Sequence, residues 1–151
     1  MHYNAEALRR LVRWARTGQA FPMYAGAEQR ATEIDTGSRF PPRTIRELVH
    51  TSARRLGDDL ATLPEPAWYA KVVTAQGRIV SASEIPWLRT REVAVHLIDL
   101  DAGVDFADLP DGLAEALATD ALTRRLGQGH GADLARWLTG RGGPPDLGPW
   151  L

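Results

Sequence analysis

The stretch EIPWLRTREVAVHLIDLDAG, residues 84–103, decides the fold. Pro86 stands where the first turn of a helix tolerates a missing N–H, and Gly103 is a helix-ending residue. The stretch therefore predicts a helix from Pro86 to Ala102. Apolar residues lie on both flanks of a narrow polar stripe and cover most of the circumference. Because helices of this kind are usually central, we expect this helix to lie inside a helical bundle.

The polar stripe consists of Glu92, His96 and Asp99, which fall within roughly 60° of one another at about 100° per residue. A Glu and a His four residues apart on an inward face are how helical bundles present metal ligands, and Asp99 would orient the imidazole from behind. The same spacing is also common on solvated helix faces, where it binds nothing. The stripe therefore predicts Glu92 and His96 as metal ligands, with a solvated ion pair as the alternative.

A third ligand has to come from another element. The chain has no cysteine, so a metal must be held by His, Asp or Glu, and thiol chemistry needs an external sulfur. His50 lies outside the apolar arc of its helix, and His130 stands in a glycine-rich break. His2, close to the first predicted helix, is the remaining candidate for the third ligand.

Helical periodicity continues on both sides of residues 84–103. It predicts helices over 4–17, with Asn4 as the N-cap, and over 27–34, 43–63, 111–126 and 132–139. The segments 71–74 and 78–81 flank Ala75-Gln76-Gly77 and predict a β-hairpin. The predicted fold is mainly α: an up-and-down four-helix bundle with a small β-hairpin insert over residues 1–126, and a short C-terminal helix and tail over 127–151.

Composition excludes several classes of protein. The 151 residues are 44% hydrophobic and 25% charged, the balance of a globular domain. Eighteen basic and 19 acidic residues give a net charge of −1, which argues against a nucleic-acid binder that relies on bulk positive charge. No apolar run approaches the roughly 18–20 residues that span a bilayer, and no signal segment precedes the first helix. We therefore expect a cytoplasmic protein that binds neither nucleic acid nor membrane.

Residues 84–103 resemble the signature helix of the mycothiol-dependent maleylpyruvate isomerases, and Val104–Pro110 extends the match. Shorter segments that resemble the family lie at 14–18, 22–24, 74–78, 135–141 and 149–151. Long, ordered matches of this kind are far more specific than a Glu and a His four residues apart.

The resemblance implies a DinB-like four-helix bundle with a divalent metal, typically zinc, on two histidines and a glutamate. Glu92 and His96 stand at two of these positions, and Arg141 matches a catalytic arginine. The implied cofactor is mycothiol, whose sulfur adds to the cis double bond of maleylpyruvate; rotation and elimination then give fumarylpyruvate. In the family, the first histidine lies about one turn before the asparagine that matches Asn4, so His2 is expected as a displaced third ligand. The family also carries a second domain after the bundle, of which residues 127–151 would be a remnant.

The predicted function is that of a mycothiol-dependent, metal-assisted cis–trans isomerase of the maleylpyruvate isomerase type, or of a related thiol transferase. Its partners would be a small-molecule substrate and a low-molecular-weight thiol. One alternative is a catalytically reduced bundle that acts as a binding or dimerisation module, and another is a bundle that binds a small ligand without metal. Because loss of most of a second domain would expose apolar surface, we expect a homodimer or a partner chain, with Trp137 and Trp150 near the covered surface.

Overall fold

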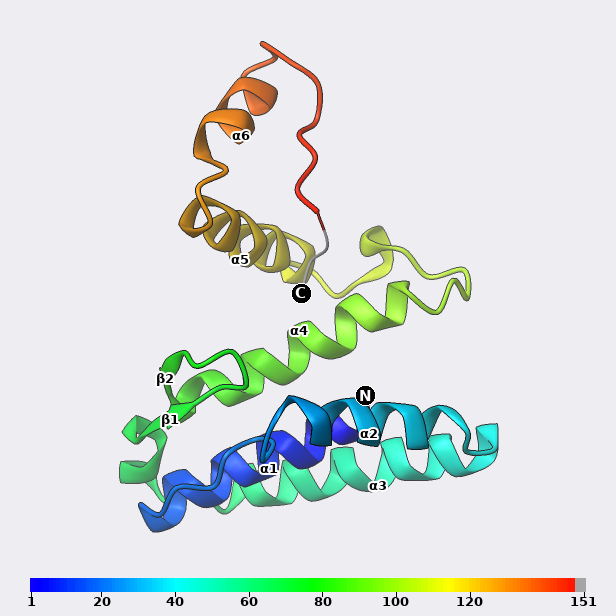
Figure 1. Ribbon diagram of the computed structural model, residues 1–151, viewed down its shortest axis with the longest axis vertical. Coiled ribbons are helices and arrows are strands. Elements are labelled where there is room, and N and C mark those ends of the chain that lie inside the picture. Colours follow the sequence, from blue (N-terminus) through cyan, green and yellow to red (C-terminus); the bar gives the residue numbers. More distant parts are fainter. Residues whose placement is uncertain (149–151) are drawn as a thin grey trace. The chain divides into compact units, whose positions relative to one another are not determined.

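The computed structural model describes residues 1–148, so Trp150 lies outside the described residues. The chain forms two compact units, unit 1 over Met1–Asp101 and unit 2 from Ala102 onward. Unit 1 contains the helices α1 (His2–Thr17), α2 (Ala27–Ser38), α3 (Pro42–Ala61) and α4 (Ile85–Ile98), with the strands β1 (Lys71–Val73) and β2 (Ile79–Ser81). Two short 3₁₀ helices, η1 (Glu65–Tyr69) and η2 (Ala82–Glu84), flank the strands. The predicted mainly helical fold with a small hairpin is confirmed (Figure 1).

The helix α1 provides more buried core residues of unit 1 than any other element. It packs against α3, α4 and β1, and Leu8 and Leu11 are almost completely buried. Its C-terminus is at Gly18, in the left-handed conformation with φ 70°, as expected for a helix-ending glycine. The most buried helix is thus α1, whereas the sequence pattern had favoured the helix at residues 86–102 as the central one.

The first turn of α1 differs from its prediction. The helix begins at His2, with Met1 as its N-cap residue, so the prediction of Asn4 as the N-cap is wrong. The Asn4 side chain instead accepts a hydrogen bond from Arg89 Nη1 in α4, at 3.1 Å. The Asn4 side chain thus binds α4 instead of capping the N-terminus of α1.

The helix α2 contains no buried residue. It approaches α1 closely at one point, where a Cβ added to Gly37 would lie 2.7 Å from Tyr3 Cε2. Any residue larger than glycine at this position would have to displace the Tyr3 ring. The close approach of α2 to α1 at this point therefore requires glycine at position 37, because Gly37 leaves room for the Tyr3 ring.

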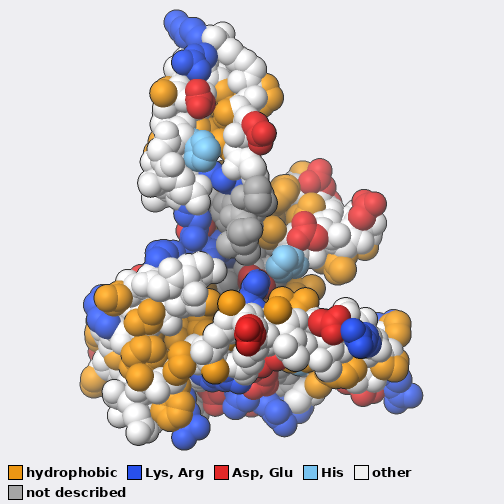
Figure 2. Space-filling view, in the orientation of Figure 1, with side chains coloured by type: hydrophobic (Ala, Val, Ile, Leu, Met, Phe, Trp, Pro, Cys, Tyr) orange, Lys and Arg blue, Asp and Glu red, His pale blue; other side chains and the backbone are white. Residues whose placement is uncertain are grey.

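The hairpin covers the end of the core that lies next to α4. Strands β1 and β2 pair antiparallel with Val72 opposite Val80, and both valines are buried. The turn between them has Gly77 at φ 78°. Tyr69 and Ile79 are exposed, and Figure 2 shows hydrophobic side chains gathered on the hairpin end of unit 1.

The helix α4 ends at Ile98, four residues before its predicted end. The amides of Leu100 and Asp101 bond to the carbonyls of Leu97 and Ile98, three residues back, which tightens and closes the last turn. Asp101 then takes a left-handed conformation with φ 48°, and the chain leaves unit 1. The polar stripe thus lies on the last two turns of α4 and at its C-cap.

Unit 2 contains the 3₁₀ helix η3 (Phe106–Asp108) and the helices α5 (Leu113–Gly127) and α6 (Gly131–Leu138). Leu117 and Leu134 are its buried side chains, and Arg125 donates to the carbonyl of Leu147. Compact units need not coincide with homologous domains, so the predicted domain boundary at Leu126 stays a prediction. Along residues 1–148, no helix is both long and apolar enough to cross a membrane.

Candidate functional site

The helix α4 brings Glu92 and His96 together one turn apart. His96 Nε2 lies 3.4 Å from Glu92 Oε1, and Asp99 Oδ2 lies 2.7 Å from His96 Nδ1. The Glu92 side chain is 22% exposed and that of His96 is 41% exposed, so the pair is half-buried and still reachable from solvent. Helical periodicity alone produces this cluster, since positions i, i+4 and i+7 share one face.

The hydrogen bond to Asp99 determines which nitrogen of His96 is free. An ionised carboxylate can only accept, so Nδ1 must carry the proton that this bond uses. In a neutral imidazole Nε2 then carries the lone pair, and Glu92 Oε1 is the carboxylate oxygen that lies 3.4 Å from it. A proton on Nε2 or a bound metal ion would make the contact between these two atoms favourable.

The start of α1 lies beside this pair. Arg89 Nη1 donates to the carbonyl of Met1 at 2.8 Å and to Asn4 Oδ1. Burial lowers the pKa of the Met1 amino group, while the negative charge of Glu92 opposes the shift. Burial also lowers the pKa of Arg89, again against the influence of Glu92. The turn of α4 from Arg89 to Glu92 therefore faces the first turn of α1.

His2 points to another side of α1. Two residues of helix separate it from Asn4, so the two side chains project about 160° apart. The His2 ring stacks on Tyr3, with ring centroids 3.8 Å apart, and its Nε2 is buried without a hydrogen-bond partner. Burial lowers the pKa of His2, and the acidic groups that oppose the shift are Glu6 and Glu33 rather than Glu92. Within residues 1–148, no three His, Asp or Glu side chains form a group that could hold a metal.

The remaining predicted residues lie elsewhere. His50 is exposed on α3, as expected, and His130 is the N-cap residue of α6. Arg141 follows α6 in unit 2, where it is exposed and its guanidinium donates to the carbonyl of Thr139. The structure thus brings Glu92 and His96 together in unit 1, and within residues 1–148 His2 forms no metal-holding group with them.

The charge of Glu92 also acts on Tyr24, a residue that the sequence does not assign to the site. Burial raises the pKa of the Tyr24 phenol, and the charge of Glu92 acts in the same direction. The positive charge of Arg30 in α2 opposes the shift. The one sequence signal for Tyr24 is its place in the segment 22–24, which resembles the isomerase family.

Three comparisons bear on the family. Residues 1–101 match the model of the mycothiol maleylpyruvate isomerase N-terminal domain. Two crystal structures of mycothiol-dependent maleylpyruvate isomerase, one of them of a histidine-to-alanine mutant, are each 45% identical to the chain with a TM-score of 0.71. Each alignment covers 73% of this chain and 46% of the solved one, so the chain spans less than half the length of that protein. A comparison with curated proteins gives no match.

The two sets of matches agree with the structure. The matched residues 1–101 coincide with unit 1, which contains the helices α1 to α4, the hairpin and the Glu92–His96 pair. An identity of 45% over a common fold shows relationship as well as shape. The chain belongs to the mycothiol-dependent maleylpyruvate isomerase family through this DinB-like N-terminal domain.

Proposed function

We propose that the chain provides the metal-binding bundle of a mycothiol-dependent cis–trans isomerase that acts on maleylpyruvate or a closely related acid. A thiol transfer with the same cofactor is the nearest related reaction. The observation that carries the proposal is the Glu92–His96 pair, in which a carboxylate oxygen lies 3.4 Å from an imidazole nitrogen. Membership of the isomerase family gives this pair its chemical context.

The donor set fits a divalent cation in two of three positions. Glu92 and His96 would supply one oxygen and one nitrogen, a combination that zinc accepts readily. When bound, the metal lowers the pKa of a thiol, so that a thiolate is available at neutral pH. Asp99 would keep His96 in the tautomer that exposes Nε2, in the way that carboxylates commonly orient metal-binding histidines.

His2 is the proposed third ligand. Its Nε2 is buried without a partner, which leaves this nitrogen available to a cation. Because His2 and Asn4 project to different sides of α1, the first turn must rearrange before His2 reaches Glu92. Asp99 or a histidine from a partner chain would take its place if the first turn holds its observed register.

Arg141 is proposed as the catalytic residue that binds a carboxylate of the substrate. A guanidinium can hold a carboxylate through two parallel hydrogen bonds, which positions the substrate as well as neutralising it. The Arg141 side chain is exposed, and its described partner is a backbone carbonyl rather than a carboxylate.

A second candidate function is a catalytically reduced bundle that acts as a binding or dimerisation module. The observation that favours it is the incomplete donor set: within residues 1–148, only Glu92 and His96 of the proposed ligands lie together. Two ligands are one fewer than a catalytic zinc site normally has. Metal content separates the two functions directly.

Zinc analysis of the purified protein tests the proposal. We expect less than one zinc per chain after dialysis, and mycothiol-dependent isomerisation of maleylpyruvate well below that of the longer relatives, because the third ligand is displaced. His2→Ala should remove the remaining zinc, while His50→Ala, at an exposed position on α3, should leave it unchanged. Stoichiometric zinc that survives His2→Ala would place the third ligand elsewhere. Absence of zinc from the unmodified protein would favour the binding module.

We further propose that the chain forms a homodimer or binds a partner chain through unit 2. Trp137 is 41% exposed and Leu138 62% exposed on α6, and Leu126 adds further exposed apolar surface. Covering this surface would remove it from water. Light scattering at tens of micromolar should therefore show a dimer, and Trp137→Ser should lower its fraction. Ile34→Ser, at an exposed apolar position in unit 1, serves as the control, and a monodisperse monomer of the unmodified protein would contradict the proposal.

A further inference from the structure

A groove of about 310 Å³ lies between α1 and α3 in unit 1. Its polar lining consists of four arginines from one helix and two acidic residues: Arg9, Arg10, Arg13, Arg16, Glu6 and Asp59. None of these residues belongs to α4 or to the proposed metal site. The volume falls at the lower end of the range for small-molecule sites, about 300–1,000 Å³.

The arginines share one side of α1. At about 100° per residue, the four fall within an arc of about 120°, on the side of the helix away from the buried Leu11. Four guanidinium groups and two carboxylates leave the lining with two unbalanced positive charges. The whole chain carries −1, so the basic character is local to this groove.

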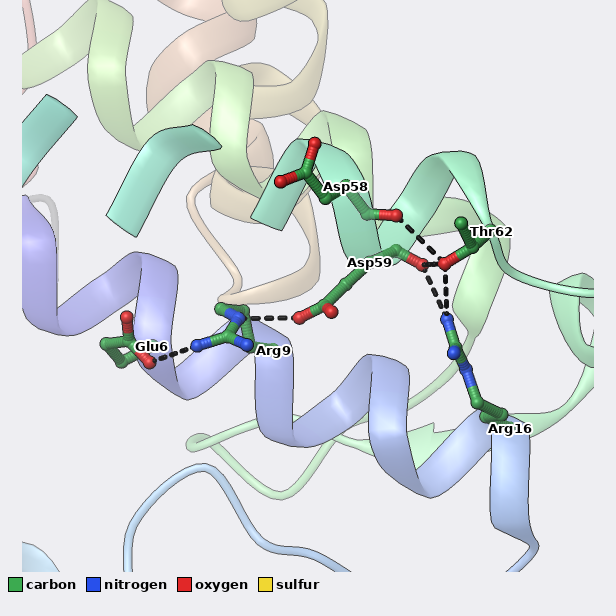
Figure 3. Close-up of polar contacts among 6 residues, drawn as sticks. All are labelled: Glu6, Arg9, Arg16, Asp58, Asp59 and Thr62. Atoms are coloured by element: carbon green, nitrogen blue, oxygen red, sulfur yellow. Dashed lines mark hydrogen bonds and ion pairs between the residues drawn. The ribbon is translucent and has the colours of Figure 1, made fainter. Parts of the chain in front are cut away.

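Arg9 uses both carboxylates of the groove. Its Nε donates to Asp59 Oδ2 at 2.5 Å and its Nη1 to Glu6 Oε2 at 2.9 Å (Figure 3). The hydrogen bond to Asp59 raises the pKa of Arg9. Because Arg9 is neutralised in this way, the unbalanced charge belongs to the other three arginines.

Those three arginines have neutral partners. Arg10 donates to the carbonyl of Met23 at 2.8 Å. Arg16 donates to the carbonyl of Asp59 and to Thr62 Oγ1, each at 2.9 Å, which fixes its guanidinium against the end of α3 (Figure 3). No carboxylate forms an ion pair with Arg10, Arg13 or Arg16 in the part of the chain that the structure describes.

Arg13 has the geometry of an open anion receptor. Its guanidinium carbon lies 4.0 Å from the centroid of the Phe21 ring, so the ring holds one flat face of the group. Stacking uses the face and leaves the in-plane N–H donors free, and these donors match a carboxylate or a phosphate in pairs. Since Phe21 and the α3 terminus already restrain Arg13 and Arg16, little side-chain freedom would be lost on binding.

The geometry points to this groove as a binding site for a small anion with at least two negative charges, held by Arg13 and Arg16 together with Arg10. The two unbalanced positive charges match a dianion. The groups that the arginines would bind are negatively charged oxygen atoms, as in a phosphate or a carboxylate. An organic phosphate and a dicarboxylate are the two sources that fit. The site does not depend on the proposed metal centre.

Titration calorimetry at low ionic strength, with inorganic phosphate and with succinate as separate probes, tests the site. At low salt the attraction is least screened, so at least one probe should bind saturably at millimolar concentration or below. Saturation by phosphate alone identifies a phosphate site, and saturation by succinate alone a dicarboxylate site. Failure of both probes to bind up to about 10 mM overturns the proposal.

Matched variants assign the binding to the groove. Arg13→Gln should weaken the binding of the active probe about tenfold or more, because a bidentate charged contact is lost. Arg13→Lys, which keeps the charge and loses the planar fork, should fall between Arg13→Gln and the unmodified protein. Arg46→Gln, an exposed arginine on α3 outside the groove, should bind like the unmodified protein. Equal weakening by Arg46→Gln and Arg13→Gln would show general charge attraction and overturn the site.

Discussion

Replacing Glu92 by glutamine is expected to weaken zinc binding by 100-fold or more. The glutamine side chain has nearly the same size and hydrogen-bonds readily, so the half-buried position on α4 should keep its fold. It lacks the negative charge that makes Glu92 a ligand and that balances the cation. Because changes behind the first ligand shell already cost about 10–100-fold in metal affinity, loss of a ligand should cost at least as much. A competition titration of the metal-free protein against a chromophoric chelator measures the effect.

Two further variants provide zinc affinities with which that of Glu92→Gln is compared. Asp99→Ala removes the partner of His96 Nδ1 and leaves Glu92 and His96 in place, so the affinity should fall by about 10–100-fold, less than for Glu92→Gln. His50→Gln should have no effect, because His50 is exposed on α3. Zinc affinity in Glu92→Gln equal to that of the unmodified protein would exclude Glu92 as a ligand, whatever the other variants do.

The second large effect is expected for Leu11→Ala in the middle of α1. Leu11 is fully buried and belongs to the same core cluster as Leu8, Val72 and Ile85, so the shorter side chain leaves a cavity that three elements surround. Substitutions of this kind lower the free energy of unfolding by about 2–5 kcal/mol. Since domains have only about 5–15 kcal/mol in total, Leu11→Ala should shift the urea midpoint strongly or prevent folding.

Ile45→Ala is the matched control for this change. Ile45 lies on α3 with 36% of its surface exposed, so its truncation should lower the free energy of unfolding by less than about 1 kcal/mol. A loss below 1 kcal/mol for Leu11→Ala as well would mean that α1 does not form the centre of the core in solution.

The elements that could be predicted from the sequence are those with strong local signals. Gly18 ends α1 where expected, and Gly77 lies in the turn of the predicted hairpin, because both take backbone conformations that other residues avoid. The end of α4 could not be located, because apolar residues continue beyond Ile98 while the backbone has already closed the helix. The central helix was misassigned for a related reason. Apolar coverage of one helix does not reveal how the other helices surround it.

The candidate site shows the same limit. The spacing of Glu92, His96 and Asp99 on one helix determines their mutual positions, so sequence alone could place them together. The approach of Met1 and Tyr24 to Glu92 depends on how other segments pack against α4, which no helical period encodes. A third metal ligand likewise depends on how other segments pack against α4. His2 follows from elimination among the histidines of the chain, which does not reveal where its side chain points.

The shallow docking of α2 has a consequence for solvent access to the site. Detaching α2 would expose no fully buried side chain of its own, so its opening should require only part of the free energy of global unfolding. Arg30, whose charge lowers the pKa of the Tyr24 phenol against the effect of burial, belongs to this helix. Brief excursions of α2 would therefore move this charge away from Tyr24 without disturbing the core around α1. The helix α2, which has no buried residue, is thus the part of unit 1 whose opening would expose Tyr24 to solvent most easily.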